Sequence, residues 1–161
     1  MALSTAPYPR ARLVVRTEDS EMTMAVQLIP IPQAAQSVDI PEPILRHLVA
    51  CGVVAGVVAG DKHYCDLEQA SHIAAQLAQA RADVQGRAIL VSDAAHRYGF
   101  HRHSIYNWIR KGWIRVIDPE PRVKIDEGDI AQARALANLV GQSPGRGVFP
   151  PHPRSGRPRK R

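Results

Sequence analysis

The sequence predicts a mainly α-helical chain with small β-hairpins, in which one structural unit occurs twice between disordered termini. Three observations favour this fold. Apolar residues recur at helical spacing in several segments, and short alternating runs lie beside them. Glycine and proline interrupt these segments at regular positions. In addition, residues 31–54 align without a gap with residues 91–114, at an offset of 60 residues.

The N-terminal residues 1–26 mix proline, serine, threonine and charged residues, so we expect a flexible arm. They lack the apolar core of a signal peptide. The longest apolar run, residues 48–60, is too short and too rich in glycine to span a bilayer. Cys51 and Cys65 form no CxxC pair, which argues against a disulfide framework or zinc knuckle. We therefore expect a cytoplasmic protein with no membrane partner, metal or cofactor.

Residues 27–86 and 87–140 form the two predicted units. Their small residues, their apolar residues and the Gly and Asp residues at the ends of elements align at the same 60-residue offset. The aligned pairs are Ala34 and Ala94, Ala35 and Ala95, Ile40 and Phe100, Leu45 and Ile105, Leu48 and Trp108, Gly52 and Gly112, Val54 and Ile114, and Asp66 and Asp126. Identity is low, so chance similarity stays an alternative, but the shared register favours an internal duplication.

Each unit is expected to contain a helix, a tight turn and a second helix. In the second unit, Ser92 is a candidate N-cap for a helix that continues to about Tyr98. Gly99 follows and is expected to supply the positive φ of the turn. The second helix is predicted from about 101 to 111, and it ends at Gly112.

Two short strands and a third helix complete the unit. Residues 113–117 and 122–125 alternate apolar and polar side chains around Asp-Pro-Glu-Pro, which predicts a hairpin. Asp126 and Asp129 then provide the Asp-x-x-Asp start of a helix that extends to about residue 140. Asp66 and Glu68, like these two aspartates, are better explained as helix caps than as an acid/base pair.

The outward face of the helix at 101–111 carries hydrogen-bond donors and a flat ring. The helix pair is expected to be held together by Ala94, Ala95, Tyr98, Phe100, Ile105 and Trp108. The outward residues are then His101, Arg102, His103, Tyr106, Asn107 and Arg110. After Asp93, no acidic residue occurs before Val116. Such a surface suits phosphates and base edges in a major groove about 12 Å wide, whereas the alternative is a merely solvated helix face.

Residues 91 to about 139 resemble the MerR/excisionase-type winged helix-turn-helix. The pattern A-x-x-x-G-[VF]-x-x-x-[ST]-[IL]-x-x-W-x-x-x-G-x-[IL] is present as AHRYGFHRHSIYNWIRKGWI, and V-x-I-D-x-x-D-[IV] follows. The resemblance implies bacterial or phage DNA binding, with the second helix in the major groove and the wing on the backbone or minor groove. It implies helix contacts by Arg102, Ser104, Tyr106, Asn107 and Arg110, and wing contacts by Arg115, Arg122 and Lys124. His101, His103 and Lys111 complete the expected contacts. No long coiled coil follows Leu139, which favours the shorter excisionase-like or small-regulator types.

The expected fold is therefore two tandem winged helix-turn-helix units, of which the first is degenerate. Residues 1–86 hold 6 Lys/Arg and 9 Asp/Glu, a charge of −3, whereas residues 87–161 hold 15 and 6, a charge of +9. At the positions that match the outward face, the first unit has Pro41, Glu42, Pro43, Arg46, His47 and Ala50. We expect residues 27–86 to contact a protein, either a second copy of the chain or a recombinase or polymerase subunit.

Residues 141–161 are rich in Pro, Gly and Arg and are expected to form a disordered basic tail. Within it, Ser155–Arg161 resembles an AT-hook, a motif that lies in a narrow A·T minor groove. The alternatives are a generic basic tail or a nuclear import signal. The expected DNA contacts of the tail are Arg154, Arg157, Arg159, Lys160 and Arg161.

The favoured function is sequence-specific binding of double-stranded DNA, as a nucleoid-associated transcriptional regulator or an excisionase-like recombination directionality factor. The alternatives are an architectural or partition protein and a protein-interaction adaptor. No catalytic residue is expected. A Cys–His pair at Cys65 and His63 is the remaining enzymatic alternative, and the spacing of His101 and His103 is unfavourable for a metal on a helix.

Overall fold

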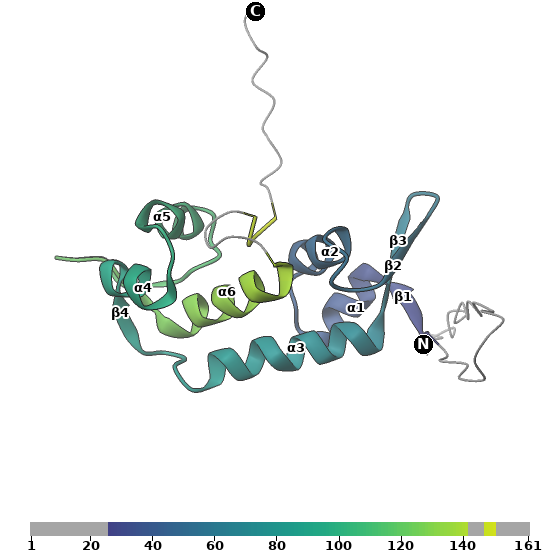
Figure 1. Ribbon diagram of the computed structural model, residues 1–161, viewed down its shortest axis with the longest axis horizontal. Coiled ribbons are helices and arrows are strands. Elements are labelled where there is room, and N and C mark those ends of the chain that lie inside the picture. Colours follow the sequence, from purple (N-terminus) through teal and green to yellow (C-terminus); the bar gives the residue numbers. More distant parts are fainter. Residues whose placement is uncertain (1–25, 142–146, 151–161) are drawn as a thin grey trace, which may run out of the picture. The chain divides into compact units, whose positions relative to one another are not determined.

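The computed structural model describes residues 26–141 and 147–150 (Figure 1). The described residues form six helices and two small three-stranded antiparallel sheets, and about 53% of them are helical. The fold is thus mixed α/β rather than mainly α, because each sheet has one strand more than the predicted hairpin. The expected arm, except for Val26, lies outside the described residues. No helix within the described ranges is both long enough and apolar enough to cross a membrane.

The first unit contains three strands, two helices and the first residues of a third helix. Its elements are β1 (Leu28–Pro30), α1 (Ile31–Val38), α2 (Glu42–Ala50), β2 (Gly56–Ala59), β3 (Lys62–Asp66) and α3 (Leu67–Ala82). Strand β3 is central and pairs antiparallel with β1 and with β2. Ile31, Leu45, Leu48 and Cys65 are fully buried and form the centre of its core.

The second unit repeats this order. Its elements are β4 (Ala88–Leu90), α4 (Val91–Tyr98), α5 (Arg102–Arg110), β5 (Val116–Asp118), β6 (Lys124–Asp126) and α6 (Glu127–Val140). Strand β6 is central, between β4 and β5. The core contains Ile105, Ile125 and Ile130, which are fully buried, and Trp108, which is 6% exposed.

The 60-residue offset holds at the level of single backbone hydrogen bonds. Helices α1 and α2 recur as α4 and α5 with every bound shifted by 60. The Ile40 N–H donates to the Ala35 carbonyl, and Phe100 donates to Ala95 in the same way. Between the helices the chain adopts a positive φ, 54° at Asp39 and 68° at Gly99. The predicted turn at Gly99 is therefore confirmed, and aspartate fills this position in the first unit.

One local expectation was wrong, and it concerns the N-cap of α4. Its N-cap is Leu90, with no side-chain cap, while the Ser92 hydroxyl donates to Asp93 at 3.2 Å. The helix starts directly from β4, and the Val91 N–H donates to the Val123 carbonyl at 3.3 Å. A backbone acceptor from the hairpin thus serves a helix N–H for which the sequence predicted a serine cap.

The boundary between the two units falls inside α3, between His72 and Ile73, rather than at 86/87. The last turns of α3 contribute to the second unit, because the Arg81 guanidinium pairs with the Asp129 carboxylate at 2.9 Å. Gly86 also contributes, since its N–H donates to Asp126 at 2.9 Å. A fragment that began at residue 87 would lack both contacts.

Candidate nucleic-acid interface

Helix α5 is oriented by its two most buried side chains. Ile105 is fully buried and Trp108 is 6% exposed. The Phe100 ring, which follows the turn, meets Trp108 edge-on with ring centroids 4.9 Å apart and an interplanar angle of 85°. Because these residues fill one side of the helix, the residues opposite them must face outward.

The outward face of α5 contains most of the expected contact residues. Exposed residues are His101, Arg102, His103, Tyr106, Arg110 and Lys111, whereas Ser104 and Asn107 are half-buried. The Arg110 guanidinium donates to Asn107 Oδ1. Arg102 and Lys111 form no ion pair with any residue in the described ranges. Their charges are therefore not neutralised by a carboxylate from these parts of the chain.

Helix α2 provides an internal comparison. At the position of Tyr106 it carries Arg46, and at the position of Arg102 it carries Glu42. These two side chains form an ion pair at 2.5 Å. The exposed cation of α2 is thus paired with an acid on its own helix, whereas α5 contains no acid.

The hairpin of β5 and β6 carries the three expected wing contacts. Lys124 Nζ lies 3.0 Å from Asp118 Oδ2, and this hydrogen bond lowers the pKa of Asp118. Arg115 pairs with Asp126 at 2.7 Å. Arg122 is exposed near the tip and has no ion pair within the described residues. Of the three, Arg122 has the least restrained charge.

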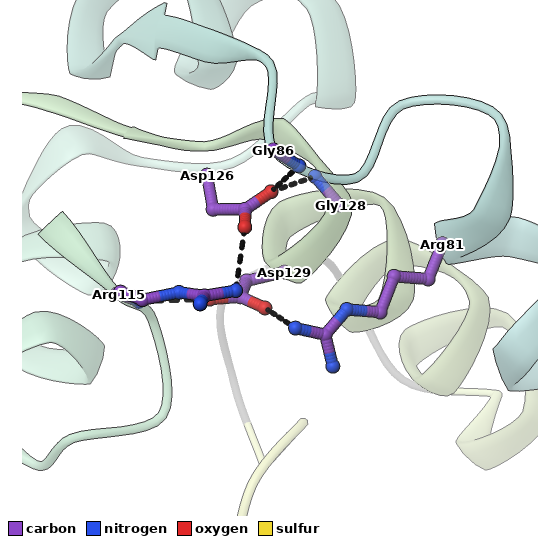
Figure 2. A network of polar contacts seen from close by, with 6 residues as sticks. All are labelled: Arg81, Gly86, Arg115, Asp126, Gly128 and Asp129. Carbon is purple, nitrogen blue, oxygen red and sulfur yellow. Dashed lines mark hydrogen bonds and ion pairs between the residues drawn. The ribbon is translucent and has the colours of Figure 1, made fainter. Parts of the chain in front are cut away.

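The base of the hairpin is held by Asp126, as Figure 2 shows. One carboxylate oxygen accepts from the N–H groups of Gly86 and Gly128, both at 2.9 Å, and the other accepts from Arg115. Asp126 is the N-cap of α6, which confirms the predicted cap. Since Asp126 is 1% exposed, its charge depends on these donors.

Asp129 completes the network in Figure 2. Its two oxygens accept from the backbone N–H of Arg115, at 2.9 Å, and from the Arg81 side chain. In the first unit the equivalent backbone N–H, that of Ala55, donates to the side chain of Gln69 at 2.8 Å. The same position of the third helix therefore holds the start of each hairpin, with a neutral amide in one unit and a carboxylate in the other.

Another buried acid, Glu127, was not singled out from the sequence. It is 1% exposed and lies 2.5 Å from Arg97, 3.7 Å from Arg87 and 3.0 Å from the Tyr98 hydroxyl. Burial and the bond to Glu127 raise the pKa of Tyr98 to about 12. The bond to Glu127 also raises the pKa of Arg97. The available signal was a glutamate at the first position of an apolar helix, with Arg-Tyr at the end of α4.

A hollow lies along each edge of α5. One, of about 290 Å³, is lined by Arg102 and Tyr106 of the helix and by Pro121, Arg122 and Val123 of the hairpin. The other, of about 370 Å³, is lined by Ser104, Asn107, Trp108 and Lys111 and by residues 147–149. The outward face of α5 thus lies between two concave margins.

The second margin corrects the expected disorder for residues 141 and 147–150, the part of the segment that the structure describes. Gly141 ends α6 with a φ of 67°, and within residues 147–150 Val148 is 1% exposed. Phe149 contacts two tryptophans, as described below. The Pro/Gly/Arg composition of the segment gave no sign that Val148 would be buried and Phe149 half-buried, because their partners lie elsewhere in the unit. The expected tail contacts Arg154, Arg157, Arg159, Lys160 and Arg161 lie outside the described residues.

The remaining chemical alternatives concern the Cys65 thiol and the pair His101 and His103. Cys65 is fully buried, and this burial raises the pKa of its thiol to about 11, so the thiol is protonated near neutral pH. No group of three metal-binding side chains occurs among the residues that the structure describes. Among these residues, His101 and His103 therefore have no third metal-binding side chain beside them.

Comparison of the chain with known protein families, curated proteins and solved structures found no match. The function of the chain is therefore inferred from the residues of α5, its flanking hairpin and the internal comparison with α2.

Proposed function

We propose that the second unit binds double-stranded DNA sequence-specifically, with α5 in the major groove and the β5–β6 hairpin on the backbone or minor groove. The observation that carries the proposal is the outward face of α5. It presents Arg102, His103, Tyr106, Arg110 and Lys111 to solvent, with no acid on the helix. An exposed helix of this chemistry fits the width and the donor and acceptor pattern of a major groove.

The distribution of charge also supports this assignment. The second unit, residues 73–161, carries +9 and the first, residues 1–72, carries −3, because Arg81 and Asp83 offset each other between the two possible boundaries. The negative charge of DNA phosphates would attract the second unit over a long range and would repel the first. We propose a small transcriptional regulator or an excisionase-like factor of the MerR/excisionase type, in which the first unit contacts a protein partner.

The test begins with selection of bound sequences from a random DNA pool by the full chain. Arg102→Ala should then cost about 1–3 kcal/mol on the selected site and relax the base preference at one position. The matched control is Arg46→Ala, which removes one exposed cation from α2 and should leave affinity and preference unchanged.

Equal losses for Arg102→Ala and Arg46→Ala, or equal losses on selected and random DNA, would refute base recognition by α5. Footprinting distinguishes the biological roles. One short protected site indicates a regulator, phased protection indicates an architectural protein, and protection beside an attachment sequence indicates an excisionase-like factor.

A further inference from the structure

Residues 147–150 (yellow in Figure 1) contact α5 and the residues just after it through aromatic rings. The ring of Phe149 stacks on Trp113, with centroids 5.1 Å apart and planes within 6°. It also meets Trp108 edge-on, at 5.3 Å and 75°. Val148, beside it, is 1% exposed. Such aromatic pairs stabilise a contact by more than the area that they bury. Residues 147–150 therefore have a defined position on the second unit, which we call their seat.

The seat lies on one particular edge of α5. Ser104 and Lys111, about two helical turns apart, line the hollow beside Phe149. Arg102 and Tyr106, one turn apart, line the hollow on the hairpin side. Residues 147–150 therefore lie at the edge of α5 opposite to the hairpin. If α5 lies in a major groove with the hairpin near one phosphate backbone, the other backbone would pass along this edge.

The sequence beyond the seat is strongly basic. Five cations follow Pro150 and no acid does: Arg154, Arg157, Arg159, Lys160 and Arg161. The first of them is 4 residues from Pro150 but 13 residues from Gly141, the last described residue of the α6 terminus. The seat thus shortens the tether between the folded unit and these cations.

We propose that Gly147–Pro150 is an anchor that delivers the basic tail to DNA phosphates along the α5 edge opposite to the hairpin. This inference rests on the proposed function. The anchor acts as the counterpart of the hairpin, so that both backbones of the groove are contacted while α5 occupies its floor. The chemistry is that of cation–phosphate attraction, strengthened by a short tether.

The size of the effect follows from the tether. Effective concentration falls roughly as the 3/2 power of linker length, so lengthening the tether from 4 to 13 residues lowers it about sixfold. The full chain with Phe149→Ala should therefore bind the selected site about sixfold more weakly. The number of cations is unchanged, so the slope of affinity against salt should be nearly retained.

A double-mutant cycle separates delivery of the tail from support of α5. Phe149→Ala is measured in the full chain and in a chain that ends at Pro150. In the shortened chain the substitution should have no effect, because no cation remains to be delivered. Equal losses in both backgrounds would overturn the proposal and assign Phe149 to packing alone.

Insertions test the same idea without altering the seat. Nine Gly/Ser residues placed between Pro150 and Pro151 lengthen the tether to about the unanchored value and should lower affinity about sixfold. The same nine residues placed between Gln142 and Ser143 leave the tether from the anchor unchanged and should have no effect. Equal effects of both insertions, or no effect of either, would refute the anchor.

The outcome for the wild-type chain separates this inference from the proposed function. If the wild-type chain does not bind DNA, or binds independently of Arg102, both fail. If it binds through Arg102 and Phe149→Ala is without effect, the anchor alone fails.

Discussion

At position 127 the chain buries a carboxylate, whereas at the equivalent position 67 it has a leucine. Glu127 needs Arg97 and Tyr98 as partners, and their equivalents in the first unit are Ser37 and Val38. The backbone is the same in both places, since the N–H of Leu67 donates to Gln27 and that of Glu127 to Arg87. The same backbone thus accommodates either of two sets of side chains at the start of the third helix: a polar solution around Glu127 or an apolar solution around Leu67.

This comparison predicts the behaviour of Glu127→Leu. The two arginine side chains are 58% and 62% exposed and can return to water, so the main loss is the acceptor of the Tyr98 hydroxyl. We expect a cost of about 1–2 kcal/mol in the free energy of unfolding. The measurement is urea denaturation of the full chain.

The matched control copies the whole first-unit solution, as Arg97→Ser, Tyr98→Val and Glu127→Leu together. Replacing a buried polar cluster by apolar residues is often neutral, so this triple variant should recover most of the loss. A triple variant less stable than Glu127→Leu alone would show that the two solutions are not equivalent.

The N-terminus of α6 packs closely against the segment that follows α3. A Cβ added at Gly128 would lie 2.9 Å from Gln85 Cα and 3.0 Å from Arg81 Cγ. The first of these atoms belongs to the backbone and cannot move as a side chain does. The glycine therefore permits the close approach of the segment that carries Arg81 and Gly86 to the base of the hairpin.

Gly128→Ala should consequently destabilise the second unit by about 1–3 kcal/mol. The equivalent residue of the first unit is the exposed Glu68, and Glu68→Ala should change the free energy of unfolding by less than about 0.5 kcal/mol. Thermal unfolding followed by circular dichroism measures both. A neutral Gly128→Ala would mean that residues 81–86 can shift without loss.

The sequence was informative where an element depends on its own residues. Gly99, the hairpin and the Asp126 cap were predicted because glycine, alternation and capping aspartate act locally. Strand β4 was missed because three residues, Ala-Ile-Leu, show no period, and its formation depends on β6. The seat of Phe149 was missed for a similar reason, since its partners Trp108 and Trp113 lie far back in the chain.

For the candidate interface, sequence gave the exposed face of α5 correctly but not the state of each charge. Exposure of Arg102, Tyr106 and Arg110 follows from helical period and the burial of Ile105 and Trp108. That Arg115 pairs with Asp126 and Lys124 with Asp118 could not be deduced, because these pairs depend on how β5, β6 and α6 meet.

For the molecule as a whole, the positive charge near the C-terminus has a measurable consequence. Deleting residues 153–161 removes five cations. If all five neutralise phosphates, the slope of log affinity against log salt should decrease by up to about 4.5, and affinity at moderate salt should fall about tenfold or more. Titrations of the full and shortened chains at several salt concentrations measure both quantities.

Scrambling Ser155–Arg161 at constant composition is the control. An AT-hook depends on the order Gly-Arg-Pro and should lose its preference for A·T flanks, whereas a generic basic tail should bind as before. An unchanged salt slope after the deletion would remove residues 153–161 from the DNA contacts altogether.

Because α1–α2 and α4–α5 have equivalent bounds and make equivalent hydrogen bonds at the turn and at both ends of the second helix, the outward residues of each second helix can be considered separately from the buried residues. The two units thus share one backbone arrangement but carry different outward residues on their second helices. The outward residues of α5 could therefore be substituted into α2 without a change in the preceding turn. That turn has a positive φ in both units, at Asp39 in the first and at Gly99 in the second. If α5 reads DNA as proposed, an exchange of surface residues alone would change the specificity and leave the buried residues in register.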